Sequence, residues 1–346
     1  MIENQYDIVL KSETKIIDNI SFENFYVNHS AKRTVVVITD EHIYDLHAHK
    51  FQYVENLMVV EPGESCKDFE TVEQALLTLQ EFDVDKNSLI IGVGGGAITD
   101  FVGFLGSIYM RGIDFEFFPT TILGAVDASI GGKNGVNFHS IKNFVGTINQ
   151  PKNIIIDYDF FSSLPVEAYQ NGMAEVIKYG CISDSVLFEY LENIDLESVI
   201  SDNNVLKTII NTCQNIKVKF IQEDVLDNGN RKLLNFGHTL GHAIEIIQEI
   251  PHGFAVAIGM VQAAKISVKL GLLKKIEFEK IKNLLSRFDL PIDCITDWQS
   301  IEKLIRNDKK KSGNTISFVV LESIGQAKTQ QISFEDLKYY YNNNHD

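Results

Sequence analysis

The sequence has 346 residues, of which 45% are hydrophobic and 23% are charged, as in a globular protein that is long enough for two domains. Its formal net charge of −16 argues against a nucleic-acid partner, because an acidic surface repels a phosphate backbone. The chain has no apolar run near the roughly 20 residues that span a bilayer and no signal-peptide pattern, so we expect a cytoplasmic protein with no membrane partner.

Short apolar runs alternate with helical patterns in the first half of the chain. Residues 69–82 have the apolar spacing of an amphipathic helix. Buried strands are predicted at residues 34–39, 57–60, 88–93, 115–118 and 153–157. This alternation is typical of an α/β domain with a parallel-type sheet and flanking helices.

The second half of the chain has a different texture. Long amphipathic stretches predict helices at residues 166–182, 204–224 and 254–270, and strand signals are few. We therefore expect residues 1–163 to form the α/β domain and residues 164–346 to form a mostly α-helical domain.

Three glycines, Gly94, Gly95 and Gly96, follow one of these strands and open a helical pattern. Glycines at such a turn let the backbone approach a diphosphate, and the helix N-terminus supplies N–H donors. The placement favours a dinucleotide site over a plain tight turn, although the spacing is not the GxGxxG of ordinary Rossmann dehydrogenases. Asp40 ends the first strand, where it would either meet an adenosine ribose or cap the next helix.

A polar segment at residues 119–143 interleaves glycines with lysines. Beside a cofactor turn, such a segment suits a loop that wraps a phosphate group. Arg111, Lys133 and Lys142 would supply the positive charge. The alternative interpretation is a solvated loop with ordinary surface lysines.

Three of the nine histidines, His238, His242 and His252, fall within fifteen positions. The i, i+4 spacing puts the first two on one helix face, to which His252 can return after one turn and a loop. A lone histidine is usually a core residue, but this cluster favours a metal or acid–base site. The pair is not HExxH, which excludes a zinc protease of that class.

A carboxylate for such a site is available at Glu175, in an otherwise apolar segment. Glu175 and Lys178 are three residues apart and therefore share a helix face. They would either take part in the site or form a simple surface ion pair.

The chain resembles the 3-dehydroquinate synthases, the sugar-phosphate cyclases of the shikimate pathway, in six segments: GGGAITDFVGF, YMRGIDF, PTTILGAVDASIGGKNGVN, GMAEVIKYG, LNFGHTLGHAIE and HGFAVAIGM. The resemblance runs from about Asp40 to about Gly325. It implies an NAD-binding α/β domain, a helical domain, an active site between them, and a homodimer. It further implies Zn²⁺ or Co²⁺ as a cofactor, and 3-deoxy-D-arabino-heptulosonate 7-phosphate as the phosphorylated substrate.

The resemblance also implies roles for individual residues. The metal ligands would be Glu175, His238 and His252, with an open coordination position for the substrate. The catalytic residues would be His242, which transfers protons, Lys178 and Asp227. Substrate contacts would come from Arg111, Asp127, Lys133, Lys142, Asn143, Lys217, Arg231, Asn235 and Lys309 or its neighbour Lys310. Arg111 would reach the phosphate across the dimer interface. NAD would lie on Asp40, Glu64, Lys67, Gly94, Gly95, Gly96, Asp100, Thr120, Thr121, Lys142, Phe160 and Ser163.

Three positions depart from the family pattern. Phe254, Asn134 and Asp227 stand where the family commonly has Glu, Thr and Glu. None of these changes removes an implied metal ligand.

Three other functions would fit parts of the sequence. A valiolone- or inosose-type cyclase would share the fold, the NAD and the metal. A metal-dependent alcohol or glycerol dehydrogenase would not need so many phosphate-binding cations. A non-catalytic NAD-binding regulator would have lost ligands or acid–base residues, and no such loss is visible.

Overall fold

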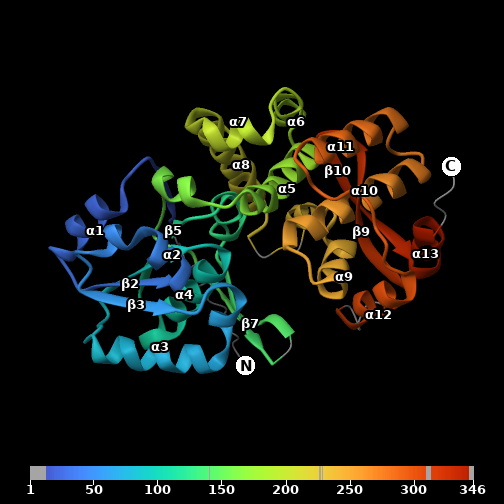
Figure 1. Cartoon of the computed structure of the whole chain (residues 1–346). Helices are drawn as coiled ribbons and strands as arrows, with labels where there is room; N and C mark the ends of the chain where they lie inside the picture. Colours follow the sequence, from blue (N-terminus) through green and yellow to red (C-terminus); the bar gives the residue numbers. More distant parts are fainter. Residues whose placement is uncertain (1–12, 140, 226, 228, 309–312, 343–346) are drawn as a thin grey trace, which may run out of the picture. The chain divides into compact units, whose positions relative to one another are not determined.

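The computed structural model describes residues 13–139, 141–225, 227, 229–308 and 313–342. The chain forms two compact units (Figure 1). The first comprises Met1–Thr120 and Ala128–Phe160, and the second comprises Thr121–Asp127 and Phe161–Asp346. The chain therefore passes from one unit to the other three times.

The first unit is built around a six-stranded parallel sheet with the strand order β1-β8-β5-β4-β2-β3. Its strands are β1 (Lys15–Asp18), β2 (Val35–Asp40), β3 (Asn56–Val60), β4 (Leu89–Gly94), β5 (Asp114–Pro119) and β8 (Asn153–Ile156). The helices of this unit are α1 (Phe22–Ser30), α2 (Glu41–His47), α3 (Phe69–Glu81) and α4 (Gly96–Ile108). The predicted fold class, the five predicted strands and the predicted helix at residues 69–82 are thus confirmed.

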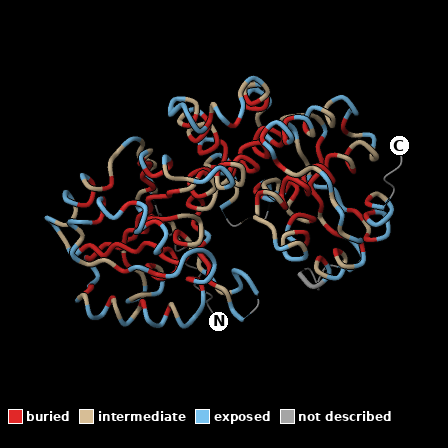
Figure 2. Tube along the Cα trace, viewed as in Figure 1, coloured by how far each residue is buried: buried red, intermediate tan, exposed pale blue. Residues whose placement is uncertain are grey.

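The central strands β2 and β4 are buried along their whole length and largely apolar, because both faces of a helix-covered parallel sheet are buried. Residues 35–38 of β2 and 89–91 of β4 are at most 2% exposed. Figure 2 shows buried strands in this unit and exposed outer turns on the helices around them.

The order in which the chain adds strands reverses beside β2. From β2 the chain moves outward to β3, and then returns to the other side of β2 to add β4 and β5. In open α/β sheets such a reversal leaves a crevice outside the carboxyl ends of the two strands, where ligands bind. These ends are Asp40 of β2 and Gly94 of β4, and the preceding residues, Thr39 and Val93, are paired in register.

Two parts of the first unit differ from the sequence prediction. Strand β1 extends the sheet beyond β8, although its four residues give no clear strand signal. The polar segment was expected to be a loop, but much of it forms an antiparallel hairpin of β6 (Lys133–Phe138) and β7 (Ile141–Ile148). Asn134, where the family commonly has Thr, closes the base of the hairpin by donating to the carbonyl oxygens of Gly132 (3.0 Å) and Asn149 (2.9 Å).

The second unit is mostly helical, as predicted. Its helices are α5 (Val166–Ile182), α6 (Ser185–Glu192), α7 (Leu196–Ser201), α8 (Asn203–Glu223), α9 (His238–Gln248), α10 (His252–Lys269), α11 (Lys275–Arg287), α12 (Trp298–Asp308) and α13 (Phe334–Asn342). The three predicted helices correspond to α5, α8 and α10. An antiparallel pair that was not predicted, β9 (Thr315–Ser323) and β10 (Gln326–Ser333), completes this unit. In the described part of the chain, no helix combines the length and the apolar character that crossing a bilayer requires.

Candidate active site

The three clustered histidines meet where α9 and α10 pack closely in the second unit. This approach depends on glycine, because a Cβ on Gly259 of α10 would overlap the carbonyl oxygen of Gly237, which precedes α9. A Cβ on Gly241 would lie only 3.1 Å from the carbonyl oxygen of Ala255. Larger residues would force the helices apart, since a packed interior leaves no room for added atoms.

This packing brings the three imidazole rings together. The ring centroids of His238 and His242 are 5.2 Å apart, and that of His252 lies 5.3 Å and 5.7 Å from them. One nitrogen from each ring lies within 4.8 Å of the other two. The three side chains could therefore hold a metal ion among them.

Glu175 of α5 lies beside two of these histidines. Its Oε1 is 3.4 Å from Nε2 of His238 and 3.6 Å from Nε2 of His252. Ligand atoms around a tetrahedral zinc ion are about 3.4 Å apart, because each bond is about 2.0–2.1 Å long. Oε1 is buried and has no hydrogen-bond partner among the described residues, an arrangement that needs an explanation such as a cation. The Glu175, His238 and His252 side chains thus fit a divalent metal.

Glycine also fixes the start of α10 against α5. The backbone N–H of Gly253 donates to Oδ1 of Asn171 at 2.6 Å, and a Cβ on Gly253 would overlap the carbonyl oxygen of Asn171. His252 is the neighbouring residue and is therefore held beside Glu175.

The charges of the cluster are strongly coupled. Burial disfavours an ionised carboxylate at Glu175, but Lys178, His238 and His252 outweigh it and lower the pKa of this carboxyl to about 2. Burial lowers the pKa of His238 to about 3, so its imidazole is neutral. Burial also opposes a charge on His252, but the carboxylates of Glu175 and Glu245 raise its pKa to about 9. A carboxylate and a neutral histidine are the forms that bind a metal.

A second polar cluster surrounds Asp127, which is partly buried, in the same unit. Oδ1 of Asp127 is 2.7 Å from Nζ of Lys217 and accepts a hydrogen bond from the Tyr179 hydroxyl at 2.6 Å. Lys217 also donates to the backbone oxygen of Asp127. Although burial favours the protonated acid, Lys217 and Lys178 hold the pKa of the Asp127 carboxyl well below its usual range. Lys178 contacts Oε2 of Glu175, so one ammonium group of α5 pairs with Glu175 and also acts electrostatically on Asp127.

The predicted cofactor residues of the first unit gather at the strand ends next to the reversal in strand order. Gly95 is the N-cap of α4 and gives it no side-chain cap, so backbone N–H groups of the first turn are available to a ligand. Thr120, at the end of β5, is fully buried, and its hydroxyl has no hydrogen-bond partner among the described residues. Asp40 caps α2 by accepting from the backbone N–H of Ile43 at 2.9 Å. These donors and the crevice suit a dinucleotide.

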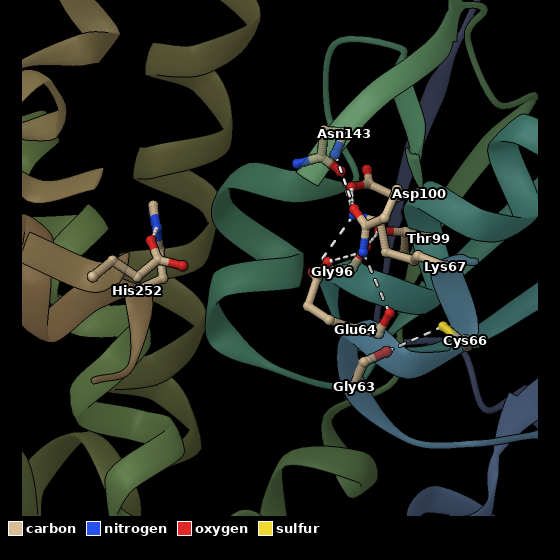
Figure 3. A network of polar contacts seen from close by, with 11 residues as sticks. Gly63, Glu64, Cys66, Lys67, Gly96, Thr99, Asp100, Asn143 and His252 are labelled. Atoms are coloured by element: carbon tan, nitrogen blue, oxygen red, sulfur yellow. Dashed lines mark hydrogen bonds and ion pairs between the residues drawn. The ribbon is translucent and has the colours of Figure 1, made fainter. Parts of the chain in front are cut away.

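Lys67 is the centre of a polar network in the same unit (Figure 3). Its ammonium group is 2.8 Å from Oδ2 of Asp100, 2.5 Å from Oδ1 of Asn143 and 3.5 Å from Oε1 of Glu64. The Lys67 side chain is 1% exposed. Lys67 therefore joins α4 to the hairpin strand β7, and its charge is neutralised within the protein.

The other implied site residues are dispersed over several elements. Lys133 and Lys142 are exposed on the hairpin, and Asn235 is exposed at the end of the short helix η6 (Asn230–Asn235). Arg231 is buried and donates to the backbone oxygen of Val225 at 3.0 Å. Asp227 lies between α8 and η6 with a left-handed φ of 59°. Lys309 and Lys310 lie outside the described residues.

Three of the residues assigned to the cofactor lie at the crossings between the units. The ring of Phe160 is 1% exposed and packs in the aromatic core of the first unit, so only its backbone could contact a cofactor. Thr121 accepts from the backbone N–H of Gly124 at 3.0 Å. Ser163 ends the short helix η5 (Tyr158–Ser163).

Arg111 lies far from the glycine turn. It is exposed in the segment that follows α4, a helix of 13 residues and therefore about 20 Å long. Met110 and Arg111 both have left-handed backbone angles, with φ of 48° and 65°. Such angles cost energy for residues other than glycine.

The sequence reasoning missed Tyr179 and Glu245. Tyr179 follows Lys178 directly and donates to Oδ1 of Asp127 and to the backbone oxygen of Val126. A tyrosine in an apolar helical pattern gives no sequence signal for such a role. Glu245 lies seven residues after His238 and three after His242, a spacing that puts all three on one helix face. This spacing was a usable signal.

Comparisons with known proteins cover both units. Residues 57–171 match the family described as 3-dehydroquinate synthase N-terminal, and residues 172–311 match 3-dehydroquinate synthase C-terminal. The chain is 38% identical to a 3-dehydroquinate synthase of Prochlorococcus marinus over 93% of this chain and 92% of the relative. It is 42% identical to a 3-dehydroquinate synthase of Thermodesulfovibrio yellowstonii over 83% and 81%.

A solved structure has the same fold. The 2-epi-5-epi-valiolone synthase of Streptomyces hygroscopicus, with NAD⁺ and Zn²⁺ bound, superposes with a TM-score of 0.88 over 97% of this chain and 98% of that one. The two sequences are 23% identical.

Proposed function

The chain belongs to the 3-dehydroquinate synthase family, and on that premise we propose how its residues convert 3-deoxy-D-arabino-heptulosonate 7-phosphate to 3-dehydroquinate and phosphate. The reaction consists of a transient oxidation, elimination of phosphate, re-reduction and an intramolecular aldol closure. It is therefore a carbon–oxygen lyase reaction with no net oxidation.

The enzyme uses NAD and a divalent metal, Zn²⁺ or Co²⁺. When bound, NAD takes up and returns one hydride, and the metal withdraws charge from the substrate hydroxyl that is oxidised. Glu175, His238 and His252 would hold the metal, because Oε1 of Glu175 lies at a suitable distance from both imidazoles and has no hydrogen-bond partner among the described residues. The first turn of α4 and the strand ends at Asp40 and Thr120 would hold NAD.

Positive charge would bind the anionic substrate. Lys217 and Arg231 are buried at neighbouring places in the second unit, and Lys217 is oriented by Asp127. Burial lowers the pKa of Lys217, and Lys178 and Arg231 add to this effect. An additional anion would relieve the mutual repulsion of these cations. Lys133, Lys142, Asn143 and Asn235 would complete the contacts to phosphate and hydroxyl groups.

His242 would move protons. It is one helical turn from His238 and is exposed, so it can reach both substrate and solvent. An imidazole with that access can take a proton from the carbon next to the transient ketone and return one later. Lys178, between Glu175 and Asp127, would stabilise negative charge that develops on the substrate.

Arg111 would serve the neighbouring subunit of a homodimer. Its position about 20 Å from the glycine turn, on a strained backbone, supports a role outside the site of its own subunit. We expect that mixing inactive Arg111→Ala protein with inactive Lys178→Ala protein restores part of the activity through hybrid dimers. No recovery after demonstrated subunit exchange would contradict the shared site.

Other functions are not favoured. The two relatives at 38% and 42% identity are both 3-dehydroquinate synthases, whereas the valiolone synthase shares only the fold at 23% identity. Buried cations such as Lys217 and Arg231 suit a phosphorylated acid as the substrate. An alcohol dehydrogenase, which acts on an uncharged alcohol, would not require them.

The cluster of Glu175, His238 and His252 beside Lys178 carries this proposal, and a phosphate-release assay tests it. The purified protein should release phosphate from 3-deoxy-D-arabino-heptulosonate 7-phosphate. A chelator should abolish the release, and added Zn²⁺ or Co²⁺ should restore it. Release that is unaffected by exhaustive chelation would contradict the metal assignment.

A further inference from the structure

Helix α9 carries a third polar residue on the face that presents His238 and His242. Glu245 lies seven residues after His238, which is close to two full turns at 3.6 residues per turn. Its side chain is 16% exposed. It therefore lies within the histidine cluster and is not a solvated surface acid.

Glu245 contacts a histidine from the next helix. Its Oε2 is 3.0 Å from Nδ1 of His252, a hydrogen-bond distance. The other ring nitrogen, Nε2, faces Oε1 of Glu175 at 3.6 Å, which is too long for a hydrogen bond. The two nitrogens of one imidazole thus face two different carboxylates in two different ways.

We propose that Glu245 is a positioning residue that prepares His252 to bind the metal. By accepting a hydrogen bond from Nδ1–H, Glu245 fixes the tautomer of the neutral ring in which Nε2 carries the lone pair, and it holds the ring so that Nε2 faces the position beside Glu175. A carboxylate in this place also makes the imidazole a stronger donor. This inference rests on the proposed metal site. It applies whether the third ligand beside His238 and His252 is Glu175 or His242, because His252 belongs to both sets.

The geometry distinguishes this role from that of an ordinary ion pair. An ion pair needs only proximity, whereas here the contact joins the residue that opens α10 to the last turns of α9. Gly253 is fixed at the same time by Asn171. The backbone of His252 is therefore held from one side, and its ring orientation is left to Glu245.

Zinc affinity measured by competition with a chromophoric chelator tests the proposal. Glu245→Ala should weaken zinc binding by about 10–100-fold, the range typical of lost outer partners of metal-bound histidines. Glu245→Gln should weaken zinc binding less than Glu245→Ala, because the amide oxygen can still accept a hydrogen bond from Nδ1–H. Some loss is expected because the amide carries no negative charge. Glu249→Gln is a matched control: it removes the same charge one turn later, from an exposed position at the end of α9, and should leave the affinity unchanged.

The outcomes separate this inference from the proposed function. If the unmodified protein binds no zinc, the metal site itself is wrong and the inference falls with it. If the unmodified protein binds zinc and Glu245→Ala binds it equally well, only the role of Glu245 is wrong. An equal loss of zinc affinity in Glu249→Gln would show that any nearby negative charge has this effect, and it would also overturn the role of Glu245. NAD binding and the melting temperature of the metal-free variants confirm folding, and the Gln variant keeps the test valid should the Ala variant fail to fold.

Discussion

The histidine cluster of the second unit is built from side chains, whereas the cofactor edge of the first unit is built mainly from backbone. In the cluster, three helices contribute Glu175, His238 and His252, and Oε1 of Glu175 lies 3.4 Å and 3.6 Å from Nε2 of the two histidines. At the cofactor edge, the useful groups are the uncapped first turn of α4 and two strand ends. Substitutions that remove a side chain should therefore abolish metal binding. Substitutions that add atoms close to the backbone should abolish NAD binding.

The largest expected effect comes from the metal ligands. Glu175→Ala, His238→Ala and His252→Ala should each lose the metal from the purified protein, because three ligands are needed to retain it. His242→Ala should keep the metal and lose activity by about 10²–10⁴-fold, the range for a missing acid–base group. Metal analysis together with phosphate release measures both. If the His242→Ala variant lacks the metal and the His238→Ala variant retains it, the proposed set of metal ligands is wrong.

Much of this cluster could be predicted from the sequence. The spacing of His238 and His242 on a helix is visible without a structure, and so is the acid in the apolar segment around Glu175. The close packing of α9 on α10 could not be predicted, because it depends on where Gly237, Gly241 and Gly259 meet in space. Glu245 was missed although its spacing was visible, since an acid at that distance is usually a solvated residue.

The first unit was less predictable where polar residues form strands. Apolar runs identified β2, β3, β4, β5 and β8 because both faces of a parallel sheet are buried. The hairpin β6–β7 is not predictable from the polar segment at residues 119–143, because its exposed polar positions and glycines match loop composition. Lys67 illustrates the limit for single residues: the sequence cannot show that its charge is satisfied by Asp100 and Asn143.

The next largest effect concerns the ion pair between Asp127 and the buried Lys217. Asp127→Ala should destabilise the protein by about 3 kcal/mol, because Lys217 would remain buried without its partner. Adding Lys217→Met should recover much of the stability but none of the activity. Chemical denaturation of the single and double variants measures both changes. A single variant as stable as the unmodified protein would show that Lys217 finds water or another partner.

A smaller effect is expected at the cofactor edge. A Cβ on Gly94 would lie 2.6 Å from Cβ of Ile98, so Gly94→Ala should displace α4 and cost about 1–3 kcal/mol. NAD affinity, measured by fluorescence titration, should fall, while the metal content stays unchanged. Gly135→Ala is a suitable control, because its added Cβ would meet its nearest neighbours at 3.5 Å. Equal NAD affinity in the two variants would contradict the hypothesis that backbone groups at the start of α4 bind NAD.

The smallest effect is a pH dependence of metal binding. The carboxylates beside His252 raise its pKa to about 9, so in the metal-free protein this ring is protonated near neutral pH. Zinc must displace that proton, and zinc affinity should rise up to about tenfold per pH unit from about pH 7 to about pH 9. The stability of the metal-free protein depends on pH in the opposite direction. The contribution of protonated His252 is complete below its unfolded pKa of about 6.5 and is lost as the pH rises through about 9. Chelator competition across this range would show a flat profile if His252 were neutral.

The fate of the hydride tests the central claim most directly. A lyase that oxidises and then re-reduces the same substrate leaves NAD unchanged, whereas a dehydrogenase releases NADH at every turnover. With far less NAD than substrate, the protein should release many equivalents of phosphate per NAD and form the carbocycle without accumulating NADH. Steady NADH accumulation in step with substrate loss would contradict the cyclase reaction and identify the protein as a dehydrogenase.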